Sequence, residues 1–121
     1  MSSLVDLRSR TTSYSLAMLR FYSGLSRETS AQILGRQVLR SATSVGAQYR
    51  EAKRAKSIAD FISKSEGALQ ELDETAYWLE LLDASAISTG EEIQALRNET
   101  EELISIFVSL IKRAKQNRAK N

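Results

Sequence analysis

The sequence contains no cysteine, histidine or proline, and only five glycines in 121 residues. Without cysteine there is no disulfide framework, thiol nucleophile or thiolate metal site. Without histidine the chain lacks the commonest general base and the commonest nitrogen ligand for metals. Because glycine and proline mark turns, their scarcity argues against a fold of many short strands. We therefore expect an all-α, non-enzymatic chain with no catalytic residues, no metal site and no cofactor.

Long apolar runs and a signal peptide are also missing. The longest apolar stretches, such as residues 104–111, are far shorter than the ~20 residues that a membrane-spanning helix needs. A chain of this length is expected to form one domain. These features predict a soluble, cytoplasmic protein with no membrane partner.

What the sequence does contain is apolar residues spaced by three and four, the pattern of amphipathic helices. Short connections between helices make neighbours antiparallel, so the pattern predicts an up-down-up-down four-helix bundle over residues 13–114. We expect residues 1–12 to be a frayed N-terminal extension and residues 115–121 to be a disordered basic tail. The expected helices cover about residues 13–24, 30–53, 57–83 and 91 onward.

Local signals mark the predicted helix ends. Gly24 is expected to end the first helix in a left-handed conformation, and Ser57 with Asp60 three residues later resembles a capping box. Gly46 lies among small residues within the second helix, which suggests that another helix passes close to it, either in the same chain or in a second subunit. Hydroxyl side chains are the candidate caps of the second and fourth helices: Ser26, Thr29, Ser30, Ser88 and Thr89.

Charge is segregated along the chain although the net charge is only +2. Residues 1–56 carry a net charge of +7, residues 57–111 carry −10, and residues 112–121 carry +5. Such segregation favours either a basic face for an anionic partner or a charge pattern that orders one copy against another.

The cations of the second predicted helix form a ridge. At 100° per residue its four arginines fall within about 80° of each other, opposite the apolar seam. Three interpretations stay open: a solvated face, ion pairs with the acidic third or fourth helix of a neighbouring subunit, or a phosphate-binding ridge for RNA or DNA. Base stacking is not expected because no aromatic residues interleave with the cations. The candidate nucleic-acid contacts are Arg36, Arg40, Arg50, Lys53, Arg54 and Lys56.

The end of the third predicted helix is apolar on most sides. Tyr77, Trp78, Leu81 and Leu82 point in different directions around its axis, and a helix end of this kind is buried from more than one side. The two aromatic residues could belong to the core of the bundle or to an oligomer contact, where Trp and Tyr are enriched. We expect the four residues to form an interface of a homo-oligomer.

A spaced set of residues resembles a bacterial family called four-helix bundle proteins, over roughly residues 13–112. The family includes proteins encoded in intervening sequences of large-subunit ribosomal RNA genes, and the accessory variability determinant of diversity-generating retroelements is related to it. Gln48, where Asn is expected, and Gly67, inside the third helix, depart from its pattern. The matching residues are 37–47 (QVLRSATSVGA), 49–52 (YREA), Ser57, 60–62 (DFI), Lys64, Glu71, 74–75 (ET) and 77–82 (YWLELL).

The resemblance implies a homopentameric ring of four-helix bundles, with no established biochemical activity for most members. The retroelement relative is thought to bind nucleic acid and a reverse transcriptase through a basic surface. We therefore expect a self-assembling scaffold or adaptor that binds RNA or DNA through its arginine ridge. The alternative is an accessory nucleic-acid-binding partner of a retroelement reverse transcriptase.

Overall fold

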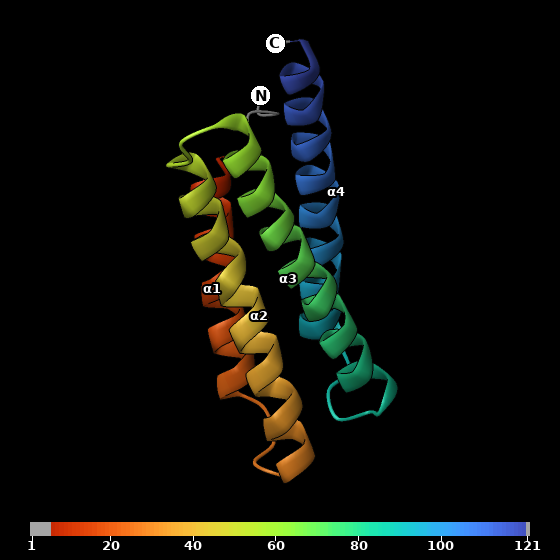
Figure 1. Cartoon of the computed structure of the whole chain (residues 1–121). Coiled ribbons are helices and arrows are strands. Elements are labelled where there is room, and N and C mark those ends of the chain that lie inside the picture. The colour runs from red at the N-terminus through yellow and green to blue at the C-terminus, as the bar shows by residue number, and fades with distance from the viewer. Residues whose placement is uncertain (1–5, 121) are drawn as a thin grey trace.

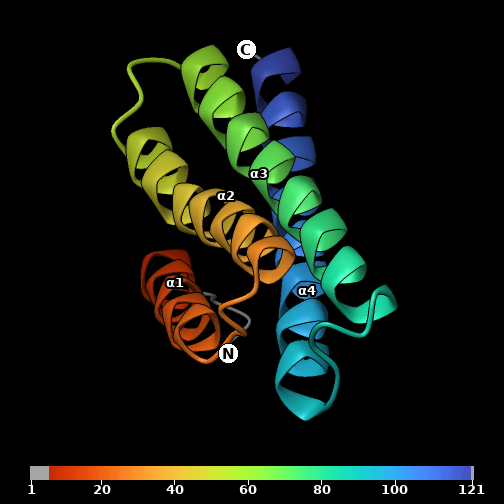
Figure 2. The same ribbon diagram turned by 90° about the horizontal axis from the view of Figure 1, so that it is seen from below.

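The computed structural model describes residues 6–120, which form four antiparallel helices in up-down-up-down order (Figure 1). The all-α bundle predicted from the apolar spacing is confirmed. Consecutive helices pack side by side, and the contact between α2 and α3 is the most extensive (Figure 2). The first and last helices, α1 and α4, also touch, but over a much smaller contact. The helices are α1 (Leu7–Ser23), α2 (Thr29–Lys53), α3 (Ile58–Ala84) and α4 (Glu91–Lys120).

The first helix begins earlier than predicted. α1 starts at Leu7, and the carboxylate of Asp6 caps it by accepting hydrogen bonds from Ser9 N at 3.2 Å and Ser9 Oγ at 2.9 Å. Leu7 and Thr11 are buried, so packing also stabilises this first turn. The prediction that residues up to 12 form a frayed extension is therefore wrong from residue 6 onward, and residues 1–5 lie outside the described residues.

The last helix also extends further than predicted. α4 continues through Lys120, so residues 115–120 are helical and not a disordered tail. Lys115 Nζ lies 3.1 Å from Glu66 Oε2 of α3, and this ion pair joins the last part of α4 to the bundle. Position 121 lies outside the described residues.

The caps follow the sequence signals only in part. Ser57 Oγ accepts a hydrogen bond from Asp60 N at 3.0 Å, as the capping box predicts. Gly24 follows α1, but its φ of −94° is not left-handed. Gly90, with a φ of 107°, precedes α4, and its carbonyl accepts from Gln94 N. Gly90 therefore occupies the N-cap position of α4, which was predicted for Ser88 or Thr89.

The second helix begins with Glu28 at the cap position. Ser26 Oγ accepts a hydrogen bond from Glu28 N at 3.1 Å, so Ser26 orders the turn before α2 and does not cap the helix itself. Thr29 and Ser30, the other two candidates, lie within the first turn of α2.

A layer of hydroxyl groups crosses the apolar core, with one residue from each helix. The Tyr14 hydroxyl lies 2.6 Å from Thr100 Oγ1, and Ser41 Oγ lies 2.7 Å from Thr75 Oγ1. All four residues are buried. Buried polar groups are tolerated when they are paired, and a paired set at one level disfavours a shifted helix register.

Glycines allow close helix contacts within the chain. A Cβ atom at Gly46 would lie 3.3 Å from Thr11 Oγ1, so the close neighbour predicted for Gly46 is α1 of the same chain. A Cβ atom at Gly67 would lie 3.0 Å from the side-chain amide of Gln48. The two departures from the family pattern, Gln48 and Gly67, are thus in contact and compensate each other in size.

The antiparallel order places four helix termini at one end of the bundle. The start of α1, the end of α2, the start of α3 and the end of α4 lie at the upper end in Figure 1. The α1–α2 and α3–α4 connections lie at the opposite end. Across residues 6–120, every helix is too short or too polar to span a lipid bilayer.

Candidate nucleic-acid interface

The arginines of the predicted ridge on α2 point toward different neighbouring helices. Arg40 turns toward α3, where its Nη2 lies 2.7 Å from Glu74 Oε1 and its Nη1 lies 3.4 Å from Glu71 Oε1. Arg50 turns toward α1, where its Nη2 donates to Thr12 Oγ1 at 3.2 Å. The acidic partner of Arg40 is therefore the third helix of its own chain, and Arg40 is less available to an external anion than predicted.

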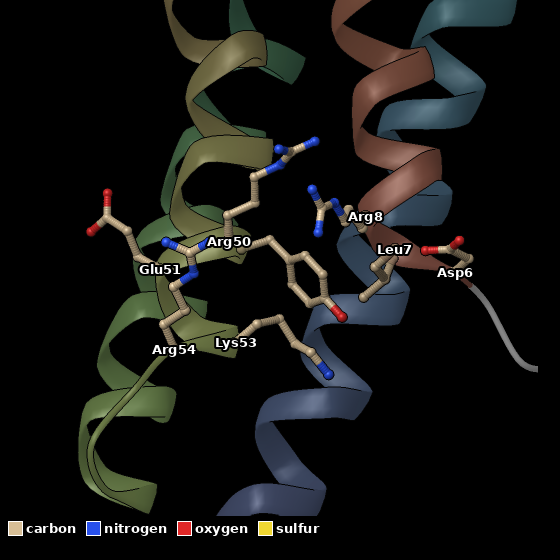
Figure 3. Close-up of a pocket in the computed structure, with 8 residues that line it drawn as sticks. Asp6, Leu7, Arg8, Arg50, Glu51, Lys53 and Arg54 are labelled. Carbon is tan, nitrogen blue, oxygen red and sulfur yellow. The ribbon is translucent and has the colours of Figure 1, made fainter.

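Arg50 belongs to a cavity between the start of α1 and the end of α2. The cavity has a volume of about 610 Å³. Figure 3 shows the guanidinium groups of Arg8 and Arg50 pointing toward each other from the two helices. Its lining residues are Asp6, Leu7, Arg8, Tyr49, Arg50, Glu51, Lys53 and Arg54.

The two carboxylates of this cavity are engaged elsewhere. Asp6 caps α1, and the hydrogen bond from the backbone of Ser9 lowers the pKa of its carboxyl group. Glu51 lies 3.6 Å from Lys64 Nζ of α3. In Figure 3 the Glu51 side chain points away from the gap between α1 and α2, and Asp6 lies on the far side of the start of α1. The negative charges nearest to the cations therefore do not lie between them.

The cations have few partners by comparison. Within residues 6–120, the ion pairs involve none of Arg8, Arg50, Lys53 and Arg54. All four are exposed. Tyr49, in contrast, is buried, its ring packs edge-on against Phe107, and burial raises the pKa of its hydroxyl. Tyr49 is thus a protonated tyrosine in the lining of the same cavity as the four cations.

Further cations from α3 and α4 gather at the same end of the bundle. Residues 46–70 and 105–120 together carry ten Lys or Arg and three Asp or Glu. Residues 71–104 carry one Arg and ten Asp or Glu. One end of the molecule is therefore strongly basic, and the half of α3 and α4 near their connection is strongly acidic. The cations of α4 at the basic end are Lys112, Arg113, Lys115, Arg118 and Lys120.

The other predicted ridge residues take separate places. Lys56 lies at the α2–α3 corner and lines a shallow hollow with Ile58 and Phe61. Arg36 is exposed on the first half of α2, outside the cavity. Sequence reasoning missed Arg8 because residues 1–12 were assigned to a frayed segment. The spacing of Asp6 and Ser9, an acidic cap three residues before its donor, is the signal that could have revealed it.

The predicted oligomer-contact residues differ in exposure. The Tyr77 side chain is 52% exposed, and its ring lies 5.1 Å from that of Trp78. Trp78 and Leu81 are half-buried, and the enclosed indole Nε1 of Trp78 has no hydrogen-bond partner among residues 6–120. Leu82 is 0% exposed in the core of its own chain, so the prediction that it contacts another subunit is wrong.

No cluster of three or more Asp or Glu side chains suited to a metal ion occurs in the part of the chain that the structure describes. The pKa is strongly raised for two groups: the Arg10 guanidinium, mainly by its hydrogen bonds to Glu99, and the buried hydroxyl of Tyr14, mainly by desolvation. That hydroxyl is enclosed in the core and hydrogen-bonded to Thr100, away from any cavity. The candidate functional site on the described surface is therefore the cluster of cations at one end of the bundle.

Four antiparallel helices with a basic end define a small helical bundle protein. Residues 6–109 match the family described as 23S rRNA-intervening sequence protein, and the chain belongs to this family. It is also similar to a crystal structure from Bacteroides thetaiotaomicron, a protein of unknown function from the S23 ribosomal protein family. The two are 37% identical with a TM-score of 0.81, over 87% of this chain and 97% of that one. No curated protein matches the chain.

Proposed function

We propose that this protein is a non-enzymatic, self-assembling helical scaffold that binds nucleic acid through the basic end of its bundle. The observation that carries the proposal is the gathering of cations from all four helices at one end, while carboxylates at that end pair with other groups. Duplex and single-stranded nucleic acids attract such a surface because bound cations displace counterions from the phosphates.

The chemistry of the basic end favours phosphate contacts over base recognition. Arginine and lysine dominate the exposed polar groups there, and the aromatic ring lining the cavity, that of Tyr49, is buried against Phe107. Base stacking needs exposed aromatic faces. We therefore expect weak dependence on nucleotide sequence and strong dependence on salt.

The names of the relatives suggest the first ligand to try. The family description refers to 23S ribosomal RNA, and the similar crystal structure is assigned to an S23 ribosomal protein family. We therefore propose single-stranded and duplex RNA as the first ligands, with DNA of the same sequences beside them.

Self-association supports this function through avidity. The exposed ring of Tyr77 and the half-buried Trp78 and Leu81 form an apolar patch on α3. Large aromatic side chains are enriched at subunit contacts. In a homopentamer the basic end is repeated five times, and several weak phosphate sites on one particle bind a long strand more tightly than one site does.

The test is a comparison of two double variants. We expect Arg54→Gln with Arg113→Gln to weaken RNA binding and to reduce the slope of log affinity against log salt by about 2, since each lost phosphate contact removes about 1. Fluorescence anisotropy across a salt series measures both quantities.

The matched control is Arg20→Gln with Arg27→Gln. It makes the same chemical change at exposed positions of the opposite end and is expected to alter neither affinity nor slope. Equal weakening by the two double variants, or no RNA binding by the unmodified protein at low salt, would reject the proposed interface.

A further inference from the structure

Two guanidinium groups from different helices converge on one cavity without a carboxylate between them. Arg8 comes from the first turn of α1 and Arg50 from the last turns of α2, and their side chains point toward each other in Figure 3. Like charges repel, and protein surfaces ordinarily intersperse acidic groups to relieve this repulsion. Here the acidic neighbours, Asp6 and Glu51, are held by Ser9 and Lys64 instead.

We propose that this cavity binds a phosphomonoester, the terminal phosphate of a nucleic-acid strand, between Arg8 and Arg50. The inference rests on the proposed function in that the phosphate is the end of a bound strand. The planar fork of a guanidinium matches two phosphate oxygens at once, and two forks from opposite sides can hold the three terminal oxygens of a monoester.

The charge of the cavity lining favours a monoester over a diester. The lining carries four cations and two carboxylates, a net charge of +2. A phosphomonoester carries about −1.5 to −2 near pH 7, whereas each phosphate inside a strand carries only −1. The monoester therefore matches the charge of the site, and an internal phosphate leaves about half of it uncompensated.

Neighbouring groups add to this preference. Lys53, one of the four cations counted above, lies on the same side of α2 as the gap in Figure 3. Tyr49 also lines the cavity, and the raised pKa of its hydroxyl keeps that group protonated, so it carries no negative charge that would repel a phosphate. The volume of about 610 Å³ is large enough for a phosphate together with the adjoining sugar.

The experiment compares strands of one sequence that differ only at their ends. One strand has hydroxyl groups at both ends, one has a 5′-phosphate and one has a 3′-phosphate, and anisotropy measures their binding at fixed ionic strength. We expect one phosphorylated strand to bind about tenfold more tightly than the hydroxyl strand, the scale of a charge-assisted hydrogen-bond pair. Arg8→Gln and Arg50→Gln should each abolish that preference, and the matched variant Arg20→Gln should retain it.

The outcomes separate this inference from the proposed function. If all three strands bind equally to the unmodified protein, the terminal-phosphate site is rejected and the general nucleic-acid interface stands. If the preference exists but survives Arg8→Gln, the cavity is not its cause, and the inference is again rejected.

A phosphorus NMR titration with a nucleoside 5′-monophosphate identifies the source of the phosphate. Binding of this small molecule that depends on Arg8, without binding of any strand, retains the phosphate site with a free monoester as its ligand and rejects the proposed function. Failure of both the strands and the monophosphate to bind rejects both.

Discussion

At the scale of single residues, the paired hydroxyl groups of the core show how each polar atom is satisfied. Thr100 Oγ1 donates to the carbonyl of Leu96 at 2.7 Å, so the hydrogen in its contact with Tyr14 comes from the tyrosine. In the second pair both hydroxyls have a carbonyl acceptor on their own helix, so either Ser41 or Thr75 can be the donor between them. The direction of the hydrogen bond is therefore defined for the Tyr14–Thr100 pair.

We expect Tyr14→Phe to lower the free energy of unfolding by about 1 kcal/mol, the net value of one buried hydrogen bond. Thr100 retains its bond to Leu96, which limits the loss. Denaturant unfolding at one protein concentration measures the change, and Tyr77→Phe, which removes an exposed hydroxyl, is the matched control with no expected effect.

The stability difference between the unmodified protein and Tyr14→Phe should also depend on pH. Burial raises the pKa of Tyr14 well above its ordinary value, and a tyrosine in the unfolded chain loses its proton near pH 10. The stabilisation by Tyr14 is therefore present below about pH 10 and is lost as the pH rises further. Phenylalanine does not titrate, so the stability difference between the two proteins should shrink above about pH 10. A constant difference across that range would contradict the buried, protonated state of Tyr14.

At the scale of elements, the start of α1 determines whether the cavity exists. Arg8 lines one cavity with Arg50 because Asp6 caps the helix and Leu7 packs into the core. Local hydrogen bonding and burial thus combine to order a segment whose composition is largely polar. The same reasoning applies to the end of α4, where the ion pair between Lys115 and Glu66 accompanies the continued helix.

We expect Asp6→Ala to destabilise the first turn of α1, because it removes the side chain that caps the helix. Hydrogen exchange at residues 7–12 should accelerate, and exchange in α3 should not. Because Asp6 has a lowered pKa, its contribution is present near neutral pH and is lost as the pH falls below about 4. Asp73→Ala, on the exposed face of α3, is the control. Unchanged exchange in residues 7–12 would show that packing alone holds the turn.

At the scale of the whole molecule, charge and apolar surface are distributed unevenly. The basic end and the acidic half of α3 and α4 make the bundle electrically polar along its length. Exposed apolar side chains such as Tyr77 lie on the sides of the bundle. This arrangement leaves the basic end free when copies associate through their sides.

We expect light scattering to give a mass of five times the 13.5 kDa chain at micromolar concentration. Tyr77→Ser should shift the protein toward the monomer, because the substitution removes exposed aromatic area and little from the core. Val108→Ser, a change at a side chain of 48% exposure on α4, is the matched control that should keep the mass. A monomeric unmodified protein would reject the oligomer.

The sequence by itself determined the four helices, most of their bounds and the cap at Ser57, because apolar spacing and capping hydrogen bonds act between residues close in the chain. Only the tertiary structure decided which side chains meet across helices. Arg40 and Arg50 look alike on a helical projection, yet one is neutralised by α3 and the other faces Arg8 of α1. Contacts between side chains of different helices depend on how whole helices pack, which no local sequence pattern encodes.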